Sequence, residues 1–375
     1  MLPSFVDFTM RTRLVAGPGL VRELATELAG YERVLVISDA QLVKLGLVRE
    51  VTEPLEAAGV DVVGVFSDVP PNSEVEVVMA GAGFARARQY DALVAVGGGS
   101  VIDTAKAINM VVATGQHLLD LQGLGVLDEP LGTLVAIPTT AGTGSEVTSH
   151  AVIKDAGTSA KLTFTSPHLA PDLAVIDPVM TRDLPPKLAA STGMDALTHA
   201  VEAYLSTNAN PFTDALALEA TRLIAQNFRR AVRERDEESR YGMLVASSLA
   251  GAAFNVALVG CVHAMAHACG GLYDVPHGVA NAILLPWGLE FNREVAAERV
   301  DELGRAFGVE DGRQFIEAVS SLAAEGGLPT RLSEVGVPRE GLEAVAEAAA
   351  VDGAVFTNPR EAGAEDLLKL LERAF

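Results

Sequence analysis

The sequence predicts an α/β domain built on a parallel sheet, followed by an all-helical domain. In the first half of the chain, short β-branched and apolar runs alternate with helical patterns, which is typical of βαβ units. Beyond about residue 184 no strand pattern recurs, and Ala-, Leu- and Glu-rich helical patterns continue to the last residue. We therefore expect a sheet domain at 1–184 and an all-helical domain at 185–375.

Five short runs are expected to form the strands of the parallel sheet. They lie at 33–38, 61–66, 92–96, 132–137 and 172–176. Helical patterns intervene at about 18–29, 47–58, 73–88 and 100–114. Two further strand-like runs, at 150–154 and 161–164, flank the turn-forming sequence Asp155-Ala-Gly-Thr-Ser and predict a hairpin.

A glycine-rich turn follows the third run. Gly97 to Gly99 lead into Ser100, where a helical pattern begins. Glycines let the backbone approach a pyrophosphate, and a helix N terminus offers free N–H groups and a positive dipole end. Ser100 and Asp103 also have the spacing of a capping box. The turn predicts a Rossmann-like dinucleotide site, although an unliganded, capped turn remains an alternative because the motif is neither Gly-x-Gly-x-x-Gly nor a Walker loop.

Other segments at predicted strand ends also fit a nucleotide. The segment 138–146 is rich in hydroxyls and glycines directly after a strand, where α/β folds bind ligands. An ordinary polar loop is the alternative. Asp39 ends the first strong strand, where a carboxylate can bind a ribose and favour NAD over NADP. A helix N-cap before Ala40 explains Asp39 equally well. Lys161 could reach a ribose or phosphate, or remain solvated.

The clearest chemistry lies in residue pairs at helical spacing. Asp195 and His199 are four residues apart, as are His263 and His267, so each pair shares one helix face. His277 follows in a Pro-His-Gly sequence. One carboxylate and several imidazoles suit a divalent transition metal such as Fe or Zn. Unpaired buried imidazoles are costly, so ordinary core histidines are the weaker interpretation.

Composition and motifs exclude several other functions. The net charge of −21 disfavours nucleic acid and anionic membranes as partners. Residue 264 is Ala where a zinc protease needs Glu, so that hydrolase chemistry lacks its base. The stretch 241–273 has no Asp, Glu, Lys or Arg, but its glycines and histidines favour two buried helices over a membrane span. Cys261 and Cys269 are too far apart on one helix for a disulfide, which fits a cytoplasmic protein.

The chain resembles the iron-containing (group III) alcohol dehydrogenase family over essentially its whole length. The segments that carry this resemblance are Gly193–Tyr204, Gly260–Gly270, Pro276–Gly278, Gly97–Ser100 and Thr139–Gly144. The arrangement is most similar to the branch of lactaldehyde reductases and propanediol dehydrogenases. The resemblance implies a dehydroquinate synthase-like fold, a homodimer, and hydride transfer between NAD(H) and a small alcohol or aldehyde.

The resemblance also implies roles for individual residues. The metal, Fe(II) or alternatively Zn(II), would be bound by Asp195, His199, His263 and His277. His267 would be catalytic, lying between the metal and the nicotinamide without binding the metal. The candidate cofactor-binding residues are Asp39, Gly97, Gly98, Gly99, Ser100, Asp103, Thr139, Thr140, Thr143 and Lys161. The substrate pocket would include Val152, Phe254 and His150, a position where that branch commonly has Asn.

Two other classes of function are alternatives to an alcohol dehydrogenase: another enzyme of the same fold, and a protein without catalytic activity. A dehydroquinate synthase-like cyclase, a glycerol dehydrogenase or a maleylacetate reductase would share the two-domain plan. A site for a phosphorylated sugar or a dicarboxylate should carry basic residues, and 241–273 has none, although Arg293 and Arg360 could contribute. A non-catalytic metal-binding scaffold would leave the two nucleotide-compatible loops unexplained.

Overall fold

The computed structural model describes residues 5–123, 126–127, 129–157 and 161–375 and divides into two compact units. The sheet unit comprises Met10–Thr140 and Ser145–Asp183. The helical unit comprises Leu184–Phe375, Ala141–Gly144 and the N-terminal segment that ends at Thr9. Two short segments that the sequence places in the first domain thus group with the helices.

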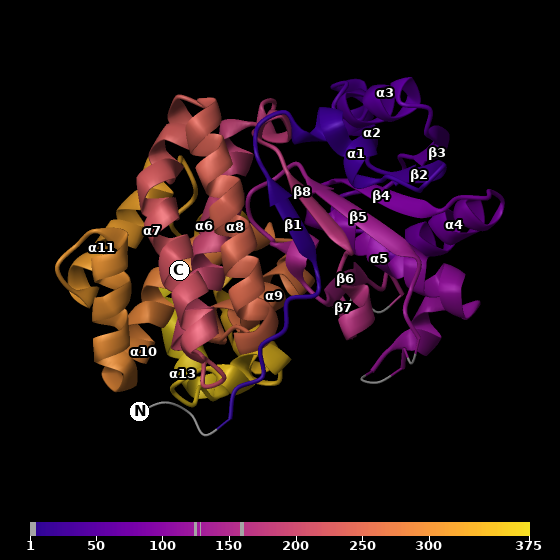
Figure 1. The fold of residues 1–375 in the computed structure, drawn as a ribbon. Coiled ribbons are helices and arrows are strands. Elements are labelled where there is room, and N and C mark those ends of the chain that lie inside the picture. The colour runs from indigo at the N-terminus through magenta and orange to yellow at the C-terminus, as the bar shows by residue number, and fades with distance from the viewer. Residues whose placement is uncertain (1–4, 124–125, 128, 158–160) are drawn as a thin grey trace. The chain divides into compact units, whose positions relative to one another are not determined.

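A six-stranded parallel sheet forms the centre of the sheet unit, in the order β1-β8-β5-β4-β2-β3 (Figure 1). Its strands are β1 (Arg13–Ala16), β2 (Arg33–Ile37), β3 (Asp61–Phe66), β4 (Ala92–Gly97), β5 (Thr133–Pro138) and β8 (Leu173–Ile176). All five predicted strands are present, and the predicted parallel sheet is confirmed. The sequence did not reveal β1, because its four residues are too few to show a pattern.

The predicted hairpin is also present. Its strands β6 (His150–Lys154) and β7 (Lys161–Thr165) pair antiparallel, with His150 opposite Thr165. The turn predicted at 155–159 lies partly outside the described residues.

Helices cover both faces of the sheet. They are α1 (Leu24–Glu27), α2 (Ala40–Lys44), α3 (Arg49–Ala57), α4 (Val75–Arg86) and α5 (Gly99–Thr114). Alternate residues of β2 belong to two different hydrophobic clusters, one on each face of the sheet. Leu35 and Ile37 pack in the cluster that contains residues of α4 and α5. Val34 and Val36 pack in the cluster that contains residues of α1 and α3. Burial on both faces explains the nearly continuous apolar sequence of this strand.

Two local predictions for these helices were wrong. The helix expected at 18–29 is a 3-10 helix at Leu20–Glu23 followed by the single turn of α1. The capping box expected from Ser100 and Asp103 does not form. Helix α5 begins at Gly99 with Gly98 as its N-cap and has no side-chain cap. Ser100 instead accepts a hydrogen bond from Asn72 N.

A fully buried lysine on α5 forms hydrogen bonds with the hairpin and the segment before it. Lys106 Nζ donates to the carbonyl oxygens of Thr148 and His150 at 2.8 and 2.7 Å. It lies 4.0 Å from Asp103 Oδ1, and Asp103 Oδ2 accepts from Val152 N at 2.9 Å. Burial lowers the pKa of Lys106 to about 8, although the carboxylates of Asp103 and Glu146 oppose the shift. The ammonium group therefore joins α5 to the first strand of the hairpin at a cost in desolvation.

We expect Lys106→Met to lower the free energy of unfolding at pH 7 by about 3 to 5 kcal/mol, because it removes the buried ammonium group that neighbours the carboxylates of Asp103 and Glu146. A second effect is expected in alkali. Between pH 8 and 10.5 the unfolded lysine keeps its proton while the folded one loses it, so wild-type stability should rise through this window. The rise is about 3 kcal/mol at 1.36 kcal/mol per pKa unit.

Urea unfolding at pH 7, 8 and 10.5 checks both effects of Lys106. The exposed Lys44 provides the matched control, and Lys44→Met should retain wild-type stability at pH 7 and the alkaline rise. An equal alkaline rise in Lys106→Met would contradict this role for Lys106.

The helical unit contains eight α-helices among its described residues. They are α6 (Pro186–Leu205), α7 (Pro211–Arg233), α8 (Glu237–Ala257), α9 (Cys261–Tyr273), α10 (His277–Phe307), α11 (Gly312–Glu325), α12 (Leu342–Ala350) and α13 (Ala364–Ala374). Helix α6 contacts α7, α8 and α10 (Figure 1). Nearly all its side chains from Ala190 onward are buried. This unit has no strand among its described residues, which confirms the all-helical prediction.

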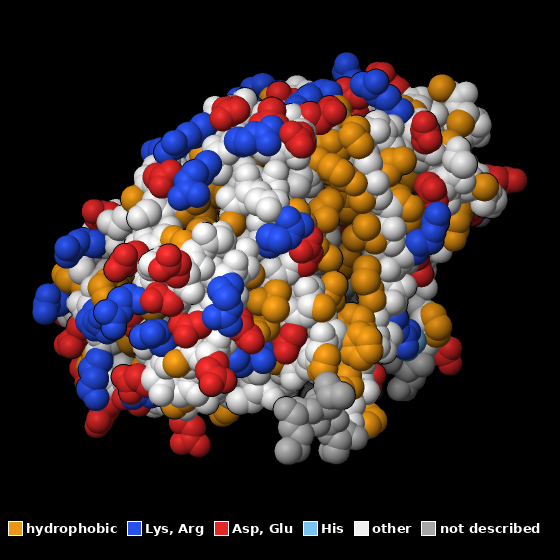
Figure 2. All heavy atoms as spheres, turned by 60° about the vertical axis from the view of Figure 1, so that its left-hand side comes forward, with side chains coloured by type: hydrophobic (Ala, Val, Ile, Leu, Met, Phe, Trp, Pro, Cys, Tyr) orange, Lys and Arg blue, Asp and Glu red, His pale blue; other side chains and the backbone are white. Residues whose placement is uncertain are grey.

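The uncharged stretch 241–273 forms most of α8 and all of α9. No single helix in the described ranges is long and apolar enough to span a membrane; α8 and α9 qualify only together, and they are bent by 100° at their junction. Cys261 and Cys269 are buried and free, as predicted. On the face shown in Figure 2, Lys and Arg side chains lie among Asp and Glu instead of forming one basic patch.

Candidate functional site

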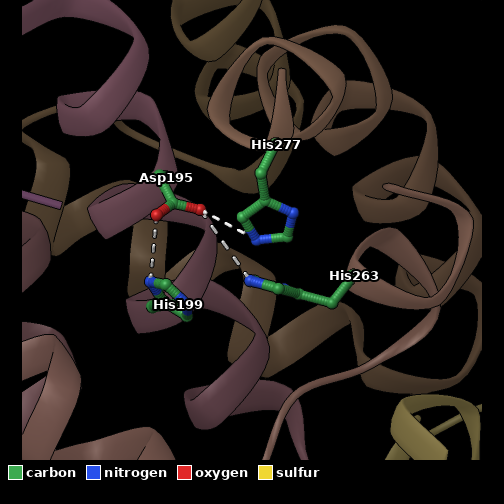
Figure 3. Close-up of side chains that lie close together, drawn as sticks. All are labelled: Asp195, His199, His263 and His277. Carbon is green, nitrogen blue, oxygen red and sulfur yellow. Dashed lines mark ion pairs between the residues drawn. The ribbon is translucent and has the colours of Figure 1, made fainter. Parts of the chain in front are cut away.

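Three helices bring the four predicted metal ligands together (Figure 3). Asp195 and His199 lie one turn apart on α6, His263 lies on the first turn of α9, and His277 is the first residue of α10. One potential ligand atom from each side chain lies within 4.8 Å of the others. Asp195 Oδ1 is 3.4 Å from His277 Nε2 and 4.0 Å from His263 Nε2.

The chemistry of this cluster fits a divalent metal ion. Asp195, His199 and His263 are buried, whereas the His277 side chain is 27% exposed. His199 Nδ1 is buried without a hydrogen-bond partner among the described residues and lies 3.9 Å from Asp195 Oδ2. Burial, together with the neighbouring histidines, lowers the pKa of His263 well below its ordinary value, so its ring is neutral and able to bind a metal.

Two further polar side chains, Glu202 and Asn281, form hydrogen bonds with the predicted ligands. Glu202, on α6, accepts a hydrogen bond from His263 Nδ1 at 2.6 Å. Burial raises the pKa of Glu202 to about 7, although backbone N–H groups at the start of α9 oppose the shift. Asn281 Nδ2 donates to Asp195 Oδ1 at 2.7 Å and lies within 3.3 Å of the Nε2 atoms of His263 and His277.

His267 lies beside the cluster and is not one of its four members. Its ring stacks on His277 with a centroid separation of 5.3 Å, and its Nδ1 is 3.0 Å from Asp352 Oδ2. Burial favours a higher pKa for Asp352, but the hydrogen bond and charge of His267 outweigh it and lower that pKa. Asp352 is therefore an ionised acceptor that can hold the proton of His267 on Nδ1.

The predicted nucleotide segments meet at one edge of the sheet unit. Asp39 follows β2, the glycine turn follows β4, and Thr139 follows β5; these three strands are neighbours. Ser38 Oγ donates to Val96 O at 2.8 Å, and Thr139 N donates to Gly97 O at 3.1 Å. These hydrogen bonds hold the carboxyl ends of the strands together, which is where open parallel sheets bind ligands.

Glycine is required where β4 ends and the chain turns into α5. A Cβ at Gly97 would lie 2.4 Å from Val101 Cβ, so only glycine allows α5 to begin this close to the strand. A Cβ at Gly98 would lie 3.2 Å from Thr140 Oγ1. The backbone at the start of α5 is therefore packed against the strand and against the loop after β5.

The contacts and exposure of Asp39 are compatible with both of its predicted roles, a helix N-cap and a ribose ligand. Asp39 Oδ1 accepts a hydrogen bond from Leu42 N at 2.8 Å and caps α2, as the structural alternative requires. The side chain is partly exposed at the carboxyl end of β2. The cap therefore coexists with a position suited to a ribose.

The other candidate residues lie in different parts of the chain. Asp103 accepts from Ser145 Oγ and Val152 N, so both of its oxygens hold the loop after β5 and the hairpin. Lys161 begins β7, and Thr143 groups with the helical unit. His150 and Val152 lie on β6, whereas Phe254 stacks on His199 with a centroid separation of 4.2 Å. Their cofactor and substrate roles remain predictions.

Comparisons with known proteins identify the family. A model of "Iron-containing alcohol dehydrogenase" matches residues 11–178, and one of "Fe-containing alcohol dehydrogenase family, C-terminal" matches residues 189–375. The chain belongs to the iron-containing alcohol dehydrogenase family. The resemblance found in the sequence is thereby confirmed, and the chain is an oxidoreductase.

Relatives with curated names cover nearly the whole chain. The 1,3-propanediol dehydrogenase of Citrobacter freundii is 40% identical over 360 residues, 93% of each chain. The lactaldehyde reductase of Escherichia coli is 39% identical over 372 residues, covering 96% of this chain and 97% of the relative.

Two solved structures have the same fold. A 1,3-propanediol oxidoreductase matches with a TM-score of 0.95 and 38% identity, covering 99% of this chain and 100% of the other. A sulfoacetaldehyde reductase from Bifidobacterium kashiwanohense in complex with NAD+ matches with a TM-score of 0.90 and 28% identity, covering 99% of both chains.

Three side chains at the site were not found from the sequence: Glu202, Asn281 and Asp352. A usable signal existed for two of them. Glu202 lies seven residues after Asp195, and Asn281 lies four residues after His277, so each shares a helix face with a predicted ligand. Asp352 is the N-cap of a 3-10 helix and lies more than 80 residues after His267 in the chain, so no local pattern indicates that contact.

Proposed function

We propose that this enzyme transfers a hydride between NAD(H) and a small primary alcohol or diol, with a divalent metal held by Asp195, His199, His263 and His277. The observation that carries the proposal is the convergence of these four ligand groups within 4.8 Å. Iron is the metal in the family name, and one carboxylate with three imidazoles also suits zinc. The names of the relatives at about 40% identity support small diols and hydroxyaldehydes as the substrate class.

The cofactor site is proposed at the carboxyl ends of β2, β4 and β5. Gly97, Gly98 and Gly99 allow close approach of a pyrophosphate to the backbone, and the uncapped N terminus of α5 supplies N–H donors. Ser100 and the hydroxyls of Thr139 and Thr140 add donors. The related reductase solved with NAD+ supports this cofactor.

The chemistry divides between the bound groups and the side chains. A metal held by the four ligand groups would supply Lewis-acid chemistry for the oxygen of the alcohol or aldehyde, and NAD(H) would supply the hydride chemistry. His267 moves the hydroxyl proton: with its Nδ1–H donated to Asp352, its Nε2 is the atom that accepts. Phe254, stacked on His199, supplies apolar surface beside the ligands.

Asp39→Gly tests the cofactor preference. We expect kcat/KM with NADP relative to NAD to rise by about 10- to 100-fold, because the carboxylate no longer repels a 2′-phosphate. Glycine is a tolerable N-cap, so α2 should lose only a few tenths of a kcal/mol. Steady-state kinetics with both cofactors measure the ratio, and an unchanged preference would remove Asp39 from the cofactor site.

The reaction itself is tested by anaerobic NAD reduction with ethanol, 1-propanol, 1,2-propanediol, 1,3-propanediol and glycerol. Metal-free protein is reconstituted separately with Fe(II) and Zn(II). We expect NADH formation with at least one metal and the highest kcat/KM for a propanediol. Absence of NADH despite measured binding of metal and NAD would favour the cyclase or maleylacetate reductase alternatives.

We further infer a cytoplasmic homodimer. The dimer follows from the family resemblance, and the two free cysteines are compatible with a reducing compartment. Light scattering on the purified protein should give twice the chain mass of 39.1 kDa.

A further inference from the structure

A second buried carboxylate lies beside the four ligand groups. Glu202 is three residues beyond His199 on α6, and its side chain is only 2% exposed. It is not a member of the cluster of converging ligand atoms. Glutamate is almost never fully buried unless it is paired, so its position calls for a specific partner.

The hydrogen-bond partners of Glu202 among the described residues lie at the start of α9. Glu202 Oε1 accepts from Val262 N at 2.7 Å. Glu202 Oε2 lies 3.2 Å from His263 N and 2.6 Å from His263 Nδ1. The first N–H groups of a helix have no partner within the helix, and its positive end favours an anion. The carboxylate is therefore an acceptor on both oxygens, and the proton on the His263 ring belongs on Nδ1.

The position of that proton decides what His263 can do. A neutral imidazole has one N–H and one lone pair, so a proton on Nδ1 leaves the lone pair on Nε2. Nε2 is the atom that faces the other ligands, 4.0 Å from Asp195 Oδ1 (Figure 3). The other tautomer would direct the N–H of Nε2 at the metal position, and a ring turned over would direct a C–H there.

We propose that Glu202 is a positioning residue of the metal centre, which holds His263 in the tautomer and ring orientation that present Nε2 to the metal. This inference rests on the metal-dependent function proposed above. The backbone is shaped for the carboxylate: a Cβ at Gly260 would lie 2.9 Å from Glu202 Oε1. Glu202 therefore couples the first turn of α9 to the ligand it carries.

Capping of α9 alone is the rival explanation, and the chain offers a matched control for it. Asn358 Oδ1 accepts from Cys261 N at 3.1 Å in the same first turn, and its other hydrogen bonds go to Asn292 and the backbone of Arg360. Loss of either acceptor should destabilise α9. Only loss of the Glu202 carboxylate should also disturb the ring of His263.

The test compares Glu202→Gln and Asn358→Ala with the full-length wild type. Glutamine keeps the shape but has one acceptor oxygen, so it cannot serve both Val262 N and His263 Nδ1. Zn(II) affinity, measured by competition with a chelator, should fall by about 10- to 100-fold in Glu202→Gln. The Co(II)-loaded variant should show an altered visible absorption spectrum. Asn358→Ala should retain the wild-type affinity and spectrum while unfolding at a lower temperature without metal.

The outcomes separate this inference from the proposed function. Unchanged affinity and spectrum in Glu202→Gln, or equal losses in both variants, would overturn the role of Glu202. A wild type that binds neither Zn(II) nor Co(II) would overturn the metal-dependent function itself. Nitrogen-15 spectra of histidine-labelled, Zn(II)-loaded wild type provide a test that needs no variant. We expect a protonated Nδ1 and a metal-bound Nε2 on His263, and the reverse assignment would refute the proposal.

Discussion

Replacement of His263 by alanine is expected to remove the metal and abolish turnover. His263 is buried between His199 and His277, with ring centroids 4.5 and 5.3 Å away, so no other side chain can take its place without repacking. Loss of an outer partner of a metal ligand already costs about 10- to 100-fold in affinity, and loss of the ligand should cost more. Because a Lewis acid contributes several kcal/mol to such a reaction, kcat should fall by at least about 10³-fold.

Metal content after dialysis, measured by elemental analysis, checks this prediction together with NADH formation. His168→Ala is the matched control, since His168 lies in a 3-10 helix of the sheet unit and should leave metal content and turnover unchanged. Circular dichroism establishes that both variants are folded. A folded His263→Ala protein that retains stoichiometric metal would show that the four converging groups are not the metal site.

The parts of the fold that could be predicted are those whose pattern is local. The runs that became β2 and β4 are buried on both faces, and continuous apolar sequence between helical patterns indicates such strands. The edge strand β1 could not be predicted, because its identity depends on pairing with β8, about 160 residues later in the chain. The break of the helix expected at 18–29 is likewise a tertiary effect, since Val21 N is hydrogen-bonded to the distant Asp177.

In the candidate site, too, the features with a local sequence pattern could be predicted and those that depend on tertiary packing could not. Asp195 with His199, and His263 with His267, are recognisable because helical spacing places each pair on one face. That α6, α9 and α10 converge is a property of packing, and at the sequence level only the family resemblance indicated it. Glu202 could not be predicted as a site residue, although it lies within the segment Gly193–Tyr204 that carries the family resemblance. Its role depends on the hydrogen bond to His263 on α9, which the sequence does not show.

Replacement of His267 by alanine should separate proton transfer from metal binding. His267 stacks on His277 and hydrogen-bonds Asp352 but is not among the four converging groups, so metal content should stay near the wild-type level. A positioned general acid–base group contributes about 10²- to 10⁴-fold, and kcat should fall by an amount in that range. Asp352→Asn should give a smaller loss, because the histidine remains but loses the anion that holds its proton on Nδ1.

Kinetics and metal analysis on the same samples distinguish the possible roles of His267. Partial recovery of kcat in His267→Ala upon addition of imidazole to the buffer would identify the missing group as a proton carrier, because a small base can occupy the space left by the ring. Loss of the metal from this variant would instead make His267 a ligand and refute the assignment. Full turnover with the metal retained would show that His267 only packs against His277. The hydroxyl proton would then have to be transferred by a route that does not involve this side chain.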